Sequence, residues 1–302
     1  MKPFKAITVY AVAILVLGAL LAPWLFLFIA WLGARLPAVA GLAGQPFDRS
    51  FTRALLLVAL AGLWPLFRTS GMGSWREFGY VRTNAWWREV LAGLAVGFGS
   101  LLLVGLLSLA LGARMVTGHL ARATIVARLL SFTASAVAVA LIEETFFRGG
   151  LQGTLQRGTN PLTALLLTSA IYSGLHFLKP APMPLAPADV RWTSGFDCLA
   201  RVVSRSLPEP GIAVGFVTLF LAGIILGLAF ARTKRLYLSM GIHAGWVFAL
   251  KSYVFFTDAT PGWIRWLGAG SLIRNILSWP VLALLVIVFW RIPLNREQIT
   301  DR

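Results

Sequence analysis

Long apolar segments recur along this chain from end to end, and they restrict its fold more than any other feature. They lie at about residues 7–33, 52–68, 89–112, 127–155, 161–178, 211–231, 236–256 and 271–291. A helix needs about 20 apolar residues to cross the hydrocarbon core of a bilayer, and most of these segments have about that length. We therefore predict an all-α polytopic membrane protein, a bundle of about eight transmembrane helices.

The charge of the chain fits a membrane protein and not a nucleic-acid-binding protein. Charged residues make up 13% of the chain, against roughly 25% in soluble domains. The net charge is +16, but the Lys and Arg residues are dispersed through the connections and form no basic arm. Cations at helix ends match anionic lipid headgroups, so the expected partner is the lipid bilayer and not nucleic acid. We expect an integral protein of a bacterial inner membrane.

We expect the whole chain, residues 1–302, to form a single membrane domain. Residues 1–70 are expected to form an N-terminal helical part, and residues 75–256 a core with the candidate site. Residues 257–302 are expected to form a C-terminal helix and tail. The first apolar run continues to about residue 34, which is too long for a signal peptide, so we expect an uncleaved helix.

Two connections between the apolar segments differ from the rest. Residues 70–89 mix Trp, Tyr and Phe with Arg, a composition typical of the membrane interface. Residues 179–210 are rich in proline and are predicted to form a loop, either a passive surface loop or an element of substrate access. The cluster of Arg232, Lys234 and Arg235 favours a topology with both termini in the cytoplasm.

A few ionisable side chains interrupt the apolar segments. Of the eleven acidic residues, only Glu143 and Glu144 fall well within such a segment. His176 and His243 lie in two others, at overlapping predicted depths if each residue rises about 1.5 Å. An ionisable group inside a membrane is costly and marks a functional site by default. We predict that helices carrying these four residues bring them to one site.

Helical spacing separates the roles of the two glutamates. Glu144 and Arg148 are four residues apart, so they share a helix face and can form an ion pair. Glu143 points about 100° away, toward another partner. We therefore predict that Glu144 and Arg148 support the site and that Glu143 is the working carboxylate. A purely structural role for both glutamates is the alternative.

Two mechanisms suit one carboxylate and two imidazoles. In the first, Glu143 and His176 hold a water, Glu143 removes its proton, and His243 stabilises the oxyanion. In the second, Glu143, His176 and His243 bind one zinc ion, which leaves a position for water. Cys198 is the only cysteine, so a Cys-based metal site is excluded. The sequence leaves the choice between no cofactor and one zinc ion open.

Three short motifs carry a resemblance to a known family. They are Glu143-Glu-Thr-Phe-Phe-Arg-Gly149, Tyr172-Ser-Gly-Leu-His176 and His243-Ala-Gly-Trp-Val247. Their order and spacing resemble the Glu-Glu-x-x-x-Arg, Phe-x-x-x-His and His-x-x-x-Asn motifs of the CPBP intramembrane proteases, which include CAAX prenyl endopeptidases of the Rce1 type. The resemblance covers about residues 75–256. It implies that the first glutamate and first histidine activate water and that the second histidine stabilises the oxyanion.

The chain departs from the pattern of the family at two positions. Tyr172 stands in place of the usual Phe, and Val247 stands where Asn often occurs. Valine cannot donate a hydrogen bond, so the oxyanion donor alongside His243 would have to be a substitute, Trp246 or Tyr172.

The function that follows from the resemblance is hydrolysis of a peptide bond within the membrane. The expected substrate is a membrane-anchored protein or peptide, cleaved near a membrane-embedded or lipid-anchored C-terminal segment. A non-catalytic membrane scaffold or immunity protein with the same fold is the alternative, and Val247 is its main support. A transporter with a proton-coupled Glu–His relay is a third reading, and the lack of inverted repeats in the sequence counts against it.

Overall fold

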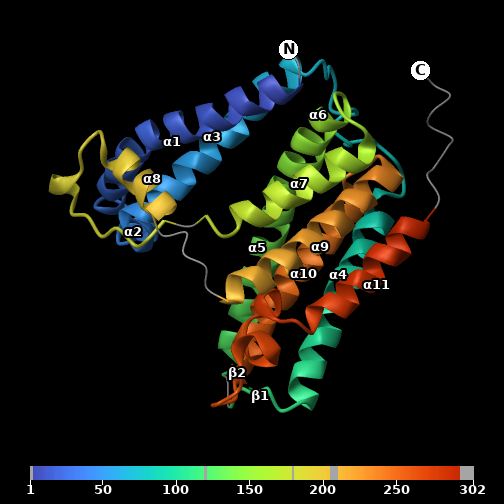
Figure 1. Cartoon of the computed structure of the whole chain (residues 1–302). Coiled ribbons are helices and arrows are strands. Elements are labelled where there is room, and N and C mark those ends of the chain that lie inside the picture. The colour runs from blue at the N-terminus through green and yellow to red at the C-terminus, as the bar shows by residue number, and fades with distance from the viewer. Residues whose placement is uncertain (1–2, 119–120, 179, 205–209, 293–302) are drawn as a thin grey trace. The chain divides into compact units, whose positions relative to one another are not determined.

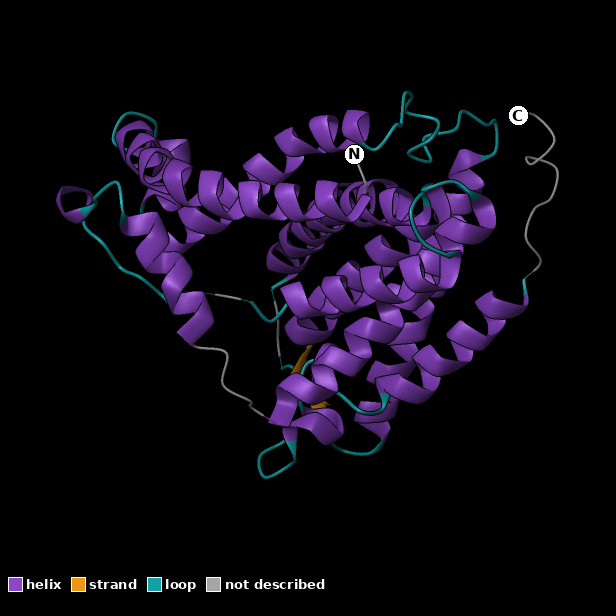
Figure 2. Cartoon of the chain, turned by 45° about the horizontal axis from the view of Figure 1, so that its top comes forward, coloured by secondary structure: helices purple, strands orange, loops and turns teal. Residues whose placement is uncertain are grey.

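A computed structural model describes residues 3–118, 121–178, 180–204 and 210–292. Helices make up most of the described chain, and loops and one short strand pair connect them, as Figure 2 shows. All eight predicted apolar segments contain a helix: α1 (Pro3–Gly33), α3 (Phe47–Thr69), α4 (Trp86–Ala110), α5 (Arg122–Glu144), α7 (Pro161–Leu175), α9 (Pro210–Thr233), α10 (Tyr237–Phe256) and α11 (Ser278–Arg291) (Figure 1). The predicted all-α class is therefore confirmed in its main features.

Five helices in the described residues are long and apolar enough to cross a membrane. They are Phe4–Gly33, Phe47–Thr69, Trp86–Ala110, Arg122–Gln156 and Gly211–Thr233. Two other apolar helices, α7 and α11, have only 15 and 14 residues. The described residues thus contain five candidate transmembrane helices. The predicted number of about eight stays a prediction.

Short elements complete the described chain. They are α2 (Pro37–Ala43), α6 (Gly153–Gln156), α8 (Ser194–Ser204), the π-helical segments η1 (Thr145–Gln152) and η3 (Arg265–Ala269), and the 3-10 turns η2 (Pro187–Asp189) and η4 (Leu272–Arg274). Strands β1 (Arg114–Val116) and β2 (Thr257–Ala259) pair antiparallel, with Met115 opposite Asp258. The sequence pattern did not predict this ribbon, because three residues are too few to show an alternation of apolar and polar side chains.

The chain divides into two compact units. Unit 1 consists of Met1–Met72 and His176–Leu207, and unit 2 consists of Gly73–Leu175 and Pro208–Arg302. The second segment of unit 1 contains most of the proline-rich connection at 179–210. Predicting this connection as a loop throughout was wrong, because α8 forms within it.

Unit 1 is built on the packing of α1 against α3 and α8. Gly195 of α8 lies so close to α1 that an added Cβ would be 1.9 Å from the carbonyl oxygen of Ala19. The core of the unit is apolar and aromatic: Ala19, Ala22, Phe26, Phe47, Phe51, Ala54, Met183 and Cys198. The carboxylate of Asp48 accepts a hydrogen bond from the backbone N–H of Met183 at 3.0 Å and so ties the connection to α3.

Unit 2 is organised around α10, which packs against α4, α5 and α9. Glycines on α4 and α10 bring the two backbones into contact. A Cβ added at Gly97 would lie 2.1 Å from the carbonyl oxygen of Ile242, and one added at Gly241 would lie 2.2 Å from that of Val90. Gly93 and Gly245 are similarly crowded, so both helices carry a Gly-x-x-x-Gly pair at the contact. Such pairs favour association in membranes because small residues allow close van der Waals packing.

Replacing Gly97 by Ala should destabilise the protein, because the added methyl group overlaps the backbone of α10. Gly99 lies two residues away on the same helix, and a Cβ added there would meet open space, so Gly99→Ala is the matched control. We expect a lower thermal midpoint in detergent for Gly97→Ala, at a cost of about 1–3 kcal/mol. The control should match the wild type or exceed it, since Ala is the better helix former. Equal midpoints for the two variants would contradict the close contact.

Candidate active site

The two glutamates lie where α5 changes its helical geometry. Glu143 and Glu144 are the last residues of α5, and the π-helical segment η1 begins at Thr145. π-Helical turns are rare and are often found at functional sites. Gly149 of η1 packs on the preceding connection, where an added Cβ would lie 2.6 Å from the ring of Phe78.

Glu144 is a completely buried carboxylate with two partners that can carry positive charge. Arg148 donates from Nη1 to its Oε1 at 3.1 Å, and His243 Nδ1 lies 2.8 Å from the same oxygen. The ion pair expected from the spacing of four residues is present, and both of its side chains have no exposed surface. Pairing offsets much of the cost of burying each charge.

Arg148 extends this network from η1 to α9. Its Nη2 donates to the carbonyl oxygen of Gly223 at 3.2 Å, and its guanidinium lies 4.8 Å from the ring centre of Tyr172. Four residues further on, Gln152 donates to the carbonyl oxygen of Gly227 at 3.1 Å. Two buried side chains of η1 therefore bind two successive turns of α9. Gln152 was not predicted from the sequence, although its position eight residues after Glu144 on the same face was a usable signal.

His243 is held by α10 at its closest approach to α4, between Gly241 and Gly245. The ring is almost fully buried, with 4% of the residue surface exposed. Its Nδ1 is the nitrogen bonded to Glu144, and its Nε2 lies 3.8 Å from Glu143 Oε2. When Glu144 is ionised, Nδ1 must carry the proton of this hydrogen bond. His243 can then donate from Nε2 only as an imidazolium, with both nitrogens protonated.

Glu143 differs from Glu144 in exposure. The side chain of Glu143 keeps 28% of its surface exposed, whereas that of Glu144 keeps none. The side chain of Glu143 is therefore open to a reactant from outside the bundle, and that of Glu144 is not. The separate roles of the two glutamates stay a prediction.

Besides Arg148, three further supporting residues lie on α7 and α10. Tyr172 is buried, and its ring stands edge-on to His243 with 6.2 Å between ring centres. The indole N–H of Trp246 donates to Ser100 Oγ at 2.9 Å, a contact with α4 that the sequence did not reveal. Val247 packs in an apolar cluster with Ala136 and Ala140 of α5.

His176 occupies a different position from the predicted one. The sequence predicts a helix over 161–178, but α7 ends at Leu175, and His176 lies in the turn that follows. It is the first residue of the second segment of unit 1, whereas both glutamates and His243 belong to unit 2. The structure thus brings Glu143, Glu144 and His243 together, and the participation of His176 stays a prediction.

The predicted zinc site can be compared with the geometry of two of its three ligands. Two atoms bound to one tetrahedral zinc at about 2.1 Å lie roughly 3.4 Å apart. Glu143 Oε2 and His243 Nε2 are 3.8 Å apart and would have to approach by a few tenths of an ångström. Within the described residues, no group of three His, Cys, Asp or Glu side chains has the arrangement of a metal site. Two near ligands do not by themselves define a zinc site.

Comparison with known proteins supports the family resemblance. Residues 125–249 match the family model described as type II CAAX prenyl endopeptidase Rce1-like. The matched region contains all three motifs, from Glu143 to Val247. Comparison with curated proteins finds no match, and neither does comparison with solved structures. The resemblance to the CPBP family is confirmed over the matched region.

Replacing Arg148 by Gln should destabilise the fold strongly, because it leaves the Glu144 carboxylate buried without its cation. Loss of one partner of a buried ion pair costs about 3–5 kcal/mol. Arg157→Gln is the control, since Arg157 pairs with Glu77 on the surface, where such pairs contribute about 0–1 kcal/mol. Thermal denaturation in detergent measures both variants. A loss for Arg148→Gln no larger than that of the control would show that Arg148 is not a structural partner of Glu144.

Proposed function

We propose that this integral membrane protein is an intramembrane endopeptidase of the CPBP type, since residues 125–249 match the family model described as type II CAAX prenyl endopeptidase Rce1-like. It hydrolyses a peptide bond near a membrane-embedded or lipid-anchored C-terminal segment of its substrate. The observation that supports this proposal most directly is the contact of His243 with both glutamates, at 2.8 Å from Glu144 and 3.8 Å from Glu143. Few other functions call for two carboxylates and a histidine at this depth in an apolar bundle.

In the proposed mechanism, Glu143 is the general base. Its carboxylate takes a proton from a water molecule, and the water oxygen attacks the carbonyl carbon of the scissile peptide bond. Glu143 then gives the proton to the leaving amine, so that the peptide bond breaks and two chains result. By family resemblance, His176 helps to hold the water.

His243 is proposed to stabilise the oxyanion that forms on the attacked carbonyl. Donation from Nε2 requires the imidazolium form, because Nδ1 is engaged with Glu144. The buried carboxylate of Glu144 supports that form by accepting the Nδ1 proton in a charge-assisted hydrogen bond. Glu144 is thus a positioning residue, and Arg148 in turn fixes the orientation of its carboxylate.

The second oxyanion donor is the open part of the mechanism. Val247 offers no donor, and the N–H of Trp246 is directed to Ser100. Tyr172 carries a hydroxyl on a ring that stands against His243. We therefore favour Tyr172 over Trp246 as the substitute donor, which would require its hydroxyl to turn toward the substrate carbonyl.

Zinc is the alternative cofactor for the same residues. Glu143, His243 and, from the sequence, His176 would hold it, and a bound zinc ion would activate a water and polarise the carbonyl group. The proposed location is the bacterial inner membrane. Both termini are placed in the cytoplasm because of the short cationic cluster of Arg232, Lys234 and Arg235.

Glu143→Gln should abolish cleavage while the protein remains folded, because glutamine cannot accept the proton of water. The measurement is the rate at which a lipid-anchored peptide is cleaved in proteoliposomes. The rate is compared between a prenylated and an acylated form of the peptide. Glu77→Gln, a change of the same kind at a surface ion pair, is the control and should retain activity. Cleavage by Glu143→Gln at the wild-type rate would refute the assignment. A wild-type protein that cleaves no anchored peptide but protects a partner would favour the scaffold alternative.

Treatment with 1,10-phenanthroline distinguishes the two cofactor proposals. If Glu143 acts without metal, the cleavage rate should stay unchanged and metal analysis should find less than one zinc per chain. Loss of activity on chelation, with recovery on addition of Zn²⁺, would establish the zinc mechanism instead. Glu143→Gln should be inactive in either case, so the two tests are independent.

A further inference from the structure

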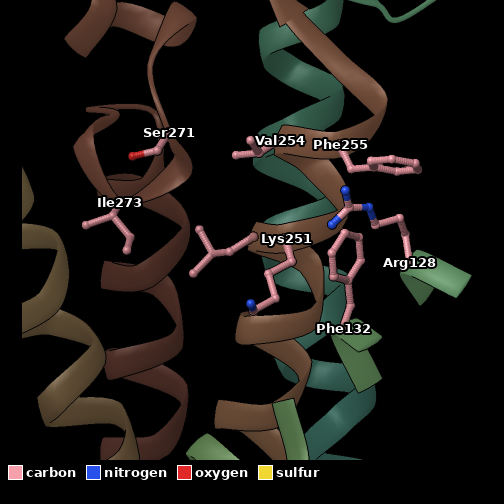
Figure 3. A pocket seen from close by; sticks show the side chains of 8 residues that line it. Arg128, Phe132, Lys251, Val254, Phe255, Ser271 and Ile273 are labelled. Atoms are coloured by element: carbon pink, nitrogen blue, oxygen red, sulfur yellow. The ribbon is translucent and has the colours of Figure 1, made fainter. Parts of the chain in front are cut away.

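A pocket of about 480 Å³ opens on the surface of unit 2, away from the glutamates. It is formed by α5, α10 and the segment around η4, and it is lined by Arg128, Phe132, Leu250, Lys251, Val254, Phe255, Ser271 and Ile273. Figure 3 shows Arg128 reaching from α5 toward α10, which carries Lys251. Its volume is within the range of small-molecule sites.

The charge of this pocket is entirely positive. Arg128 and Lys251 both line it, and no carboxylate does. Neither cation forms an ion pair with a described residue, although Lys251 Nζ lies 5.9 Å from the ring centre of Phe132. Two cations that line one pocket without a carboxylate attract anions to it, so the expected occupant is anionic.

The other walls are apolar, and so is the surface around them. Val126, Leu130 and Val254 have more than half of their surface exposed, at 58%, 67% and 58%. In a membrane protein, such a surface faces lipid. An occupant that satisfies both the cations and the apolar walls must combine an anionic group with a hydrocarbon part.

The position of the two cations along their helices fits the level of lipid headgroups. Arg128 is six residues from the start of α5 at Arg122, which corresponds to about 9 Å. Lys251 is five residues from the end of α10 at Phe256, which corresponds to about 8 Å. A long cationic side chain at this distance from a helix end reaches the headgroup region, and Figure 3 shows that of Arg128 turned toward Phe255, near the end of α10, whereas that of Lys251 points away from Phe255.

Packing separates the pocket from the active site. Between them along α5 and α10 lies an apolar cluster of Ala136, Ala140 and Ala244 with Val247 and Phe248. A peptide tail bound near Glu143 would therefore have to cross a packed interface to reach Lys251. This favours a lipid over the C-terminal carboxylate of a substrate.

We propose that Arg128 and Lys251 bind the phosphate of an anionic phospholipid, whose glycerol and upper acyl chain lie against Phe132, Phe255 and Ile273. The Ser271 hydroxyl is a further donor to a phosphate oxygen. A lipid at this place joins α5 to α10, the two helices that carry Glu143 and His243. The site thereby links the lipid composition of the membrane to the stability of the active-site pair.

The test is native mass spectrometry of the full-length protein in detergent with added phosphatidylglycerol or phosphatidylcholine. The wild type should retain phosphatidylglycerol in preference to phosphatidylcholine. The affinity of the double variant Arg128→Gln, Lys251→Gln for phosphatidylglycerol should be roughly thirtyfold lower. Each cation near a lipid surface contributes about fivefold in affinity, and the two factors multiply. The control is Arg76→Gln, Arg82→Gln, which changes the charge equally at exposed positions outside the pocket.

Three outcomes would overturn the proposal. One is equal affinity of the pocket variant and the control for phosphatidylglycerol. Another is displacement of the lipid by millimolar inorganic phosphate, which would make the pocket a site for a free anion. The last is binding of a peptide through its free C-terminal carboxylate. In that case the wild type would bind the amidated peptide with lower affinity than the free one, and the pocket variant would bind both with equal affinity. The exchange Arg128→Lys, Lys251→Arg should retain lipid binding, because it keeps both charges.

Discussion

The contacts of the buried Glu144 carboxylate with Arg148 and His243 are the interaction on which the rest of unit 2 depends. A carboxylate without exposed surface is stable only if its charge is compensated nearby. Arg148 of η1 pairs with it at 3.1 Å, and His243 of α10 forms a hydrogen bond with it through Nδ1 at 2.8 Å. Arg148 then reaches a carbonyl group of α9. One charge therefore joins three parts of the bundle in a single register, and a slip of any of them would leave a buried charge without a partner.

Close helix packing is the condition for this arrangement. In a membrane, apolar side chains gain little from leaving lipid for another helix, so helices associate through shape. Gly93 and Gly97 of α4 meet Gly241 and Gly245 of α10 without space for a side chain. His243 lies between the two glycines of α10, and its height in the bundle is fixed by a contact made entirely of backbone. The rigid helix pair supplies the histidine, and the π-helical break after α5 supplies the glutamates.

The two sites proposed for this protein lie at different levels of the interface between α5 and α10. At one level it carries the pair Glu143 and His243, where hydrolysis is proposed. At another level it carries two cations over an apolar pocket, where an anionic phospholipid is proposed. The apolar cluster between the two levels keeps them chemically separate and joins them mechanically. An intramembrane protease depends on its lipid solvent for access to substrate, and such a pocket would make that dependence specific for headgroup charge.

The sequence by itself determined the helical class, the positions of the eight apolar helices, and the pairing of Glu144 with Arg148. These depend on local periodicity, since hydropathy marks a helix and a spacing of four residues places side chains on one face. It failed at the end of α7, at α8 and at the β1–β2 ribbon, where short segments carry no clear period. Only the tertiary structure decided that His243 bonds Glu144 through Nδ1 and lies beside Glu143, and that Gln152 binds α9. Contacts between residues about a hundred positions apart depend on how helices rotate and approach, and glycine packing settles this in three dimensions.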